Sequence, residues 1–129
     1  MNSPLMSTLE KEWAHHKYAV LEKDPAAYQA IRTLLKNKQD PDPVLFYGLI
    51  EKASAQEDQI GRQDNAIQHV WGYFKQCATV EEKAAFEDKH SRWLHSEMSL
   101  QELKKELFDL ALKYHRDYLL NSSYFDSVR

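Results

Sequence analysis

Residues suited to recognition chemistry gather in one short stretch near the middle of the chain. At about 100° per residue, a helix would place Asn65, His69, Gly72 and Gln76 on one uncharged stripe, with Tyr73 at its edge. Asparagine offers paired donors and acceptors, histidine can change charge near neutral pH, and a mid-helix glycine lets a ligand approach closely. The stripe predicts a polar recognition surface. In the structural alternative, Asn65 caps a helix, His69 is hydrogen-bonded in the interior, and Gly72 admits a crossing helix.

A second candidate group surrounds Lys17, which falls within the apolar stripe of the first predicted helix. Its neighbours along that helix are Trp13, His16 and Tyr18. A cation among aromatic rings suits base stacking and phosphate contact. In the alternative interpretation, Trp13 belongs to the core and the aliphatic part of Lys17 covers its rim.

Metal and nucleophile chemistry have little support in the sequence. Cys77 is the only cysteine, so one chain can build no disulfide, no CxxC zinc site and no cysteine-ligated iron–sulfur cluster, and we expect a buried structural thiol. Glu12 with His15, and Glu87 with His90, have the Glu-x-x-His spacing of di-iron bundles, but the first pair points away from the apolar stripe. We therefore predict no metal, no cofactor and no catalytic residue, and we lean against an enzyme.

Composition places the chain among globular proteins. It has 129 residues, 43% of them hydrophobic, with only three glycines and four prolines, which disfavours an all-β sandwich. The formal charge is −3, from 17 basic and 20 acidic residues, so nucleic-acid binding driven by bulk charge is disfavoured and only a local basic patch would serve. No segment approaches the roughly 20 apolar residues of a membrane span. We expect a cytoplasmic protein without membrane contact.

Helix start signals recur along the chain and predict a single all-α domain over residues 1–129. Three segments fit a capping box and two fit an aspartate N-cap followed by proline; they are Ser7…Glu10, Thr79…Glu82, Ser99…Glu102, Asp24-Pro25 and Asp42-Pro43. With a further start near Asp64, the signals predict a bundle of about six helices. Their expected spans are 7–22, 25–37, 43–57, 64–77, 80–95 and 100–120.

Apolar positions indicate which faces enter the core. In the fourth predicted helix, the face opposite the polar stripe carries Ile67, Val70 and Trp71, followed by Phe74. Residues 121–129 are expected to form a short extended tail that docks on the rest of the protein.

The central stretch resembles a known motif. Asn65-x-x-x-His69-x-x-Gly72-Tyr73-Phe74-Lys75 is similar to the N-x-L-x-H-x-x-G-Y-F-K signature of the YbgA-like family, a bacterial and archaeal domain of unknown function, with Ile67 in place of the usual leucine. Further similarities follow the family's order along the chain, at His16-Lys17-Tyr18, Asp24-Pro25-x-x-Tyr28, Glu82-Lys83 and Tyr118-Leu119…Tyr124-Phe125. The resemblance covers about residues 12–126.

One element of the family pattern is missing. Family members usually carry Y-R-x-G-x-x-P-L between the fifth and last helices, whereas residues 90–99 contain neither glycine nor proline. Arg92 is the candidate for the arginine of that element. We do not expect a site built from this loop to carry over.

The resemblance indicates in which kinds of protein the domain occurs, and it does not indicate a reaction. Family members occur alone or as the C-terminal module of proteins whose N-terminal domain resembles thiouracil desulfidases, which are linked to the removal of sulfur from 4-thiouridine in tRNA. That chemistry needs a cysteine-bound iron–sulfur cluster, which this chain cannot build. A separate desulfidase-like protein is therefore a candidate partner.

These observations favour a non-catalytic binding module that recognises tRNA or a thiolated nucleotide. The predicted contacts are to phosphate, from Lys17, Arg62 and Lys75, and to a base or ribose, from Asn65, His69 and Tyr73.

Two alternatives stay open. The first is a small-molecule enzyme or sensor with His69 as acid and base in a pocket. The second is a homo-oligomer or adaptor, marked by an exposed apolar patch involving Trp93 or the tail residues Tyr124 and Phe125.

Overall fold

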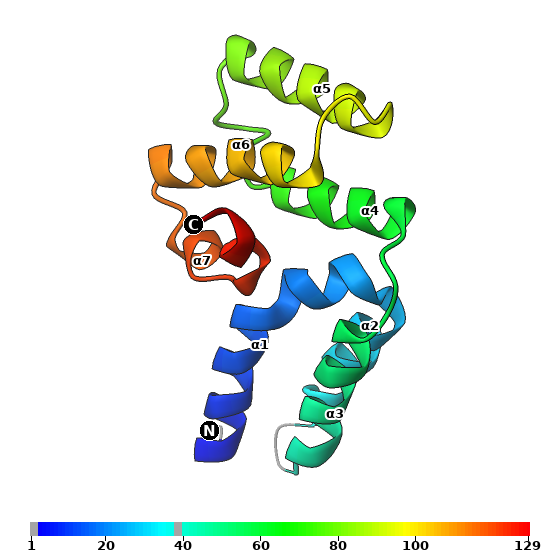
Figure 1. The fold of residues 1–129 in the computed structure, drawn as a ribbon. Coiled ribbons are helices and arrows are strands. Elements are labelled where there is room, and N and C mark those ends of the chain that lie inside the picture. Colours follow the sequence, from blue (N-terminus) through cyan, green and yellow to red (C-terminus); the bar gives the residue numbers. More distant parts are fainter. Residues whose placement is uncertain (1–2, 38–39) are drawn as a thin grey trace. The chain divides into compact units, whose positions relative to one another are not determined.

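The computed structural model describes residues 3–37 and 40–129, and this part of the chain contains helices and no strand (Figure 1). The predicted all-α class is confirmed. In chain order the elements are α1 (Pro4–Lys23), α2 (Pro25–Leu34), α3 (Pro43–Ser54), α4 (Ile60–Trp71), α5 (Val80–Leu94), α6 (Leu100–Lys113), α7 (Asp117–Leu120) and the 3-10 helix η1 (Ser123–Val128). Among the described residues, no helix is long and apolar enough to cross a membrane.

The chain divides into two compact units, which are described separately. The first unit comprises Met1–Ala66 and Ser122–Tyr124, and the second comprises Ile67–Asn121 and Phe125–Arg129. In the first unit α1, α2 and α3 pack against one another, and in the second α6 packs against both α5 and α7. The fully buried side chains include Met6, Leu9, Ile31 and Phe46 in the first unit, and Ile67, Val70, Phe74, Leu103 and Leu107 in the second.

Four of the five predicted helix caps are present. Asp24 and Asp42 accept hydrogen bonds from the backbone of the first turns of α2 and α3, each ahead of a proline. Thr79 and Ser99 cap α5 and α6 in the same way. The start predicted at Ser7 is wrong, because Ser3 accepts from the Met6 amide and Pro4 opens α1. That start is again a hydroxyl cap followed by proline.

The fourth helix differs most from its expected span of 64–77. It begins at Ile60 and ends at Trp71, so Gly72 lies after the helix and not within it. Beyond Trp71 the amides of Tyr73 and Phe74 bond to carbonyls three residues back, at 3.1 and 2.9 Å. The chain therefore tightens into turns that the α-helical periodicity did not predict.

The helix expected over 100–120 is interrupted. α6 ends at Lys113, His115 adopts a left-handed backbone with φ of 54°, and the Arg116 amide bonds to the Ala111 carbonyl at 2.9 Å. This pairing is the Schellman arrangement that closes many helices. α5 ends in the same way, with Ser96 at φ of 60°.

The C-terminal segment docks through the buried Ser122, Tyr124 and Phe125, as expected, although it forms a 3-10 helix and not an extended tail. In the first unit the hydroxyls of Ser122 and Ser123 donate to the His15 carbonyl, at 3.4 and 3.1 Å. In the second unit Phe125 packs on Phe108, with ring centroids 5.5 Å apart. Docking of this segment therefore rests on both aromatic burial and hydrogen bonds.

Candidate functional site

The polar residues of the central motif point outward from α4. Asn65 and His69 are one turn apart and both exposed, and neither side chain makes a hydrogen bond or ion pair with another described residue. Ile67 and Val70, between and beside them, are fully buried. The structural interpretation, in which Asn65 caps a helix and His69 lies in the interior, is therefore wrong for both residues.

Gly72 lies directly after α4, so its interpretation as a mid-helix glycine is corrected. A Cβ atom built at this position would lie 3.1 Å from the carbonyl oxygen of His69, so a larger residue would require that backbone to shift by a few tenths of an ångström. Gly72 is exposed at the end of the Asn65/His69 face. The close approach of a ligand to Gly72 stays a prediction.

The two remaining residues of the motif's outer side differ in exposure. Tyr73 is half-buried and its ring lies nearly parallel to that of Tyr118, with centroids 6.4 Å apart and planes 19° apart. Tyr118 itself is 43% exposed. Lys75 is exposed and forms no ion pair with a described residue. The second unit thus presents His69, a tyrosine pair and a free lysine.

In the first unit, Trp13 and Lys17 have separate roles. Trp13 is buried and packs on Tyr28, with ring centroids 5.4 Å apart, so the prediction that it contacts a ligand is corrected to a core role. Lys17 is half-buried, with its amine 5.7 Å from the ring centroid of Tyr18 and 6.0 Å from that of Tyr28. Burial lowers the pKa of the Lys17 amine, and the charge of Arg32 lowers it further.

The other two predicted residues of this unit already have partners. A guanidinium nitrogen of Arg62 donates to the carbonyl of Lys23 at 3.0 Å, which satisfies one of the free carbonyls at the end of α1. His16 lies 3.5 Å from a carboxylate oxygen of Glu12 and lines a cavity of about 190 Å³ between α1 and α3. Arg62 is therefore first a structural residue.

The predicted site residues consequently fall into two sets. Trp13, His16, Lys17, Arg62 and Asn65 belong to the first unit, and His69, Gly72, Tyr73 and Lys75 belong to the second. Members of both sets lie on α4, where Arg62 and Asn65 belong to the first unit and His69 belongs to the second. Sequence reasoning missed Arg32 and Tyr118, since neither lies near the motif in sequence.

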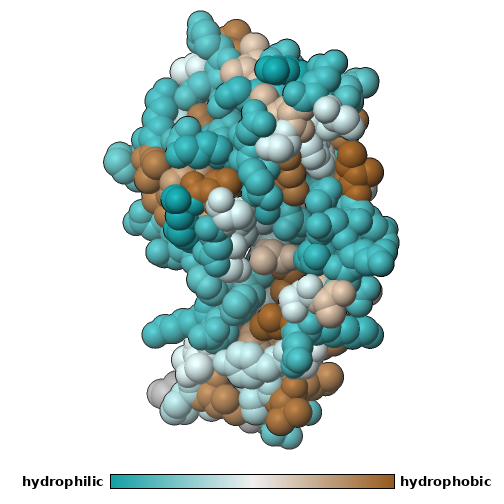
Figure 2. Space-filling view, in the orientation of Figure 1, coloured by the Kyte–Doolittle hydropathy of each residue, from teal (hydrophilic) through white to brown (hydrophobic). Residues whose placement is uncertain are grey.

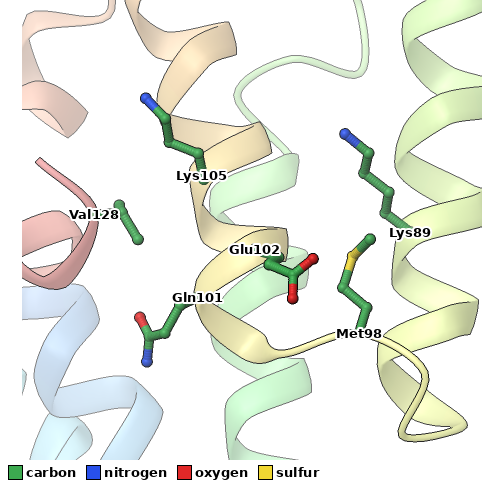
Figure 3. A pocket seen from close by; sticks show the side chains of 6 residues that line it. All are labelled: Lys89, Met98, Gln101, Glu102, Lys105 and Val128. Carbon is green, nitrogen blue, oxygen red and sulfur yellow. The ribbon is translucent and has the colours of Figure 1, made fainter.

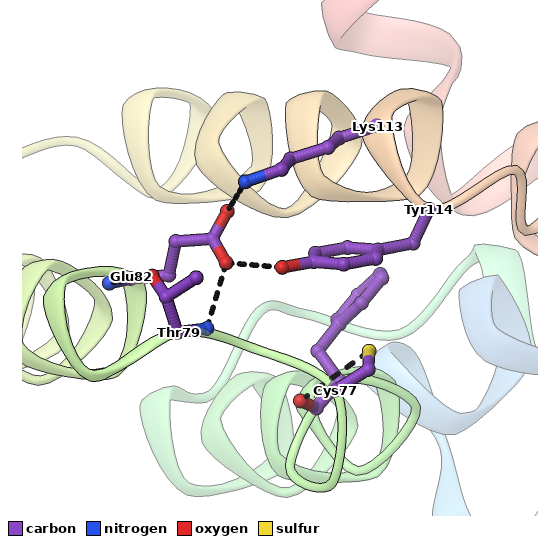
Figure 4. A network of polar contacts seen from close by, with 6 residues as sticks. Cys77, Thr79, Glu82, Lys113 and Tyr114 are labelled. Atoms are coloured by element: carbon purple, nitrogen blue, oxygen red, sulfur yellow. Dashed lines mark hydrogen bonds and ion pairs between the residues drawn. The ribbon is translucent and has the colours of Figure 1, made fainter.

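A polar network in the second unit was not predicted as such. The Glu82 carboxylate accepts hydrogen bonds from the Lys113 amine at 2.8 Å, from the Thr79 amide at 2.9 Å and from the Tyr114 hydroxyl (Figure 4). These bonds lower the pKa of Glu82 to about 2, with the Lys113 bond contributing most. The same bond raises the pKa of Lys113. The network joins α5 to α6, so it serves the fold.

An open cavity of about 500 Å³ lies beside the start of α6. Lys89, Met98, Gln101, Glu102, Lys105 and Val128 line it, and Figure 3 shows the side chain of Glu102 directed toward Met98, whose own side chain extends toward Lys89. Both lysines already form ion pairs, Lys89 with Glu106 and Lys105 with Asp109. The cavity therefore carries no free cation, and His69 does not line it.

The exposed apolar surface lies elsewhere than expected. Trp93, Tyr124 and Phe125 are all buried because they pack into the core, so the predicted patch at these residues is wrong. Val44, on α3, is instead 83% exposed, and Leu45, Tyr47 and Leu5 are each at least 41% exposed. Figure 2 shows apolar surface at the end of the first unit where α1 and α3 begin.

The described residues contain no cluster of potential metal ligands, and the surroundings of Cys77 differ from those expected of a core thiol. No group of three or more His, Cys, Asp and Glu side chains among them could hold a metal ion. Cys77 is half-buried, with its sulfur 3.7 Å from the Phe74 carbonyl and 3.7 Å from a guanidinium nitrogen of Arg116. It is thus less buried than expected for a core thiol.

Comparison with known proteins gives a family and no activity. No curated protein and no solved structure matches the chain. A family model described as "Protein of unknown function (DUF1722)" matches residues 17–128, which include the entire central motif. The chain therefore belongs to the DUF1722 family, which is the YbgA-like family that its motifs resemble.

Proposed function

We propose that this chain is a non-catalytic binding module that recognises tRNA or a thiolated nucleotide. One observation carries the proposal. Within the central motif the apolar residues Ile67, Val70 and Phe74 are fully buried, whereas Asn65, His69 and Lys75 are exposed. Burial in the core explains the three apolar residues. The side chains of the three exposed residues make no hydrogen bond or ion pair in the described structure, so folding does not explain their presence.

The exposed groups suit an RNA ligand. An asparagine and a neutral histidine can hydrogen-bond the edge of an unpaired base, and a lysine can pair with a phosphate. The Tyr73 and Tyr118 rings add an aromatic surface on which a base can stack, a contact worth about 1–3 kcal/mol. In this proposal Asn65, His69 and Tyr73 contact the base or ribose, and Lys75 contacts phosphate.

The proposal also includes a cellular compartment and a partner protein. The module would act in the cytoplasm, alone or with a desulfidase-like protein that supplies the cysteine ligands this chain lacks. The net charge of −3 opposes an RNA polyanion at long range. Binding would therefore depend on a few local contacts and weaken with salt in proportion to the few phosphates that are contacted.

Binding of bulk tRNA, with and without 4-thiouridine and titrated over salt, tests the proposal. We expect salt-sensitive binding that is tighter for the thiolated tRNA, a several-fold loss in His69→Ala, and a salt slope smaller by about 1 in Lys75→Gln. Lys83→Gln is the matched control, because Lys83 is also exposed, lies outside the motif and has no ion pair with a described residue. Absence of binding at low salt, or equal losses in Lys75→Gln and Lys83→Gln, would overturn the proposal.

A further inference from the structure

Two cationic side chains of the first unit approach the same aromatic ring. The Lys17 amine, on α1, lies 6.0 Å from the centroid of the Tyr28 ring, and the Arg32 guanidinium carbon, one turn after Tyr28 on α2, lies 5.8 Å from it. The Tyr18 ring adds a second aromatic face, 5.7 Å from the Lys17 amine. The packing of α1 against α2 therefore places two positive charges at one tyrosine.

Lys17 differs from the other half-buried lysines, and the exposed Arg32 beside the same ring also lacks an acidic partner. Lys23 is paired with Asp58 at 3.0 Å and Lys89 is paired with Glu106. Lys17 and Arg32, in contrast, form no ion pair with any described carboxylate. The fold has thus matched these other half-buried lysines with acids and left this pair of cations unmatched.

The arrangement has an electrostatic cost that an anion would remove. Burial lowers the pKa of the Lys17 amine and Arg32 lowers it further, so both effects disfavour the charged lysine. Cation–π contact with the two tyrosines offsets part of that cost. Folding alone would be served as well by an uncharged side chain at position 17.

We propose that Lys17 and Arg32 form a binding site for a phosphate group beside the Tyr28 ring. Phosphate fits better than carboxylate because two unmatched cations can balance a phosphate dianion or two successive phosphodiesters. The guanidinium fork of Arg32 matches phosphate oxygens, while Lys17 acts as a point charge. The phosphate could belong to an RNA backbone or to a phosphorylated small molecule, and only the RNA source rests on the proposed function.

Inorganic phosphate is the first probe. We expect titration into the ¹⁵N-labelled chain, at ionic strength held constant with chloride, to give saturable shifts at the amides of Lys17, Tyr28 and Arg32. Arg32→Gln should weaken this binding about fivefold, as expected for one exposed ion pair. Lys36→Gln is the control, since it removes the same charge from an exposed position just after α2. Arg32 is also exposed, so its variant should fold, as circular dichroism will check.

The outcomes separate this site from the proposed function. No saturable shift, or an equal loss in Arg32→Gln and Lys36→Gln, overturns the phosphate site whatever tRNA does. Phosphate binding without tRNA binding supports the site and overturns the RNA proposal. If both ligands bind, a tRNA salt slope reduced by about 1 in Arg32→Gln assigns the site to RNA backbone, and an unchanged slope assigns it to a phosphorylated small molecule such as a nucleoside monophosphate.

Discussion

Glu82, in the first turn of α5, accepts a hydrogen bond from the hydroxyl of Tyr114, which caps the end of α6. The same carboxylate completes the α5 capping box by bonding the Thr79 amide (Figure 4). One side chain therefore both starts a helix and ties it to the end of the next. Glu82-Lys83 is one of the elements that this chain shares with its family, and the geometry gives Glu82 a structural role.

The Glu82 network predicts a specific loss of stability in acid. The carboxyl pKa falls from 4.5 to about 2 on folding, so its contribution is fully present above pH 4.5 and is lost as the pH falls toward 2. Glu82→Gln should lower the melting temperature at neutral pH and flatten its decline between pH 4.5 and 2. Thermal unfolding across this range measures both effects. Glu81→Gln, an exposed neighbour in the same turn, should keep the wild-type slope, and equal slopes in both variants would contradict the assignment.

Helix starts could be predicted from the sequence, and helix ends largely could not. A start is encoded locally by a hydroxyl or aspartate cap, as at Asp24, Asp42, Thr79 and Ser99. An end is encoded locally only when glycine marks the left-handed residue. Here Ser96 and His115 adopt that conformation, so neither helix end is marked by a glycine. The end predicted at residue 95 lies one residue from Leu94, whereas the end predicted at residue 120 lies seven residues beyond Lys113.

Glycine at the left-handed positions should stabilise the protein. A non-glycine residue there costs about 1–2 kcal/mol, and Ser96→Gly and His115→Gly each remove that cost. We expect each to raise the free energy of unfolding by about 1 kcal/mol in urea titrations. Ser91→Gly, within α5, should do the opposite because glycine is unfavourable in a helix interior. Destabilisation by Ser96→Gly would show that the serine side chain is itself required.

Two glycines should respond in opposite ways to alanine. At Gly72 the added methyl would meet the His69 carbonyl at 3.1 Å, so Gly72→Ala should destabilise the chain by about 1 kcal/mol. At Gly48, inside α3, nothing lies within 4 Å, and Gly48→Ala should stabilise it by up to about 1 kcal/mol. Urea unfolding of both variants gives the comparison. A neutral Gly72→Ala would mean that the turn after α4 relaxes and that the motif's glycine serves something other than the backbone.

The candidate site was only partly predictable for a related reason. The spacing of Asn65 and His69 on one helical face is a local property, and both are exposed as a recognition surface requires. The partners of Lys17, Arg62 and Tyr73 come from other helices, so single-helix periodicity carried no information about them. Arg32 in particular lies beside the same Tyr28 ring as Lys17 only because α1 packs against α2.

Arg62 and Lys75 should separate stability from binding. The Arg62 guanidinium donates to the Lys23 carbonyl at the end of α1, and Lys23 is itself paired with Asp58 at 3.0 Å. Arg62→Gln removes a charge-assisted bond, and we expect a loss of about 1–2 kcal/mol in urea unfolding. Lys75→Gln, which removes an exposed side chain without an ion pair to a described residue, should change stability by less than about 0.5 kcal/mol.

The same two variants test which basic residue near the central motif contacts tRNA. Measured at a temperature where both variants remain folded, tRNA affinity should fall in Lys75→Gln and stay close to wild type in Arg62→Gln. A stable Arg62→Gln variant that loses tRNA binding would return Arg62 to phosphate contact, because its four remaining N–H groups can still face an anion. If tRNA affinity instead stayed close to wild type in Lys75→Gln, recognition would depend on the uncharged groups of Asn65 and His69. The positive charge near α4 would then serve to hold the first unit together.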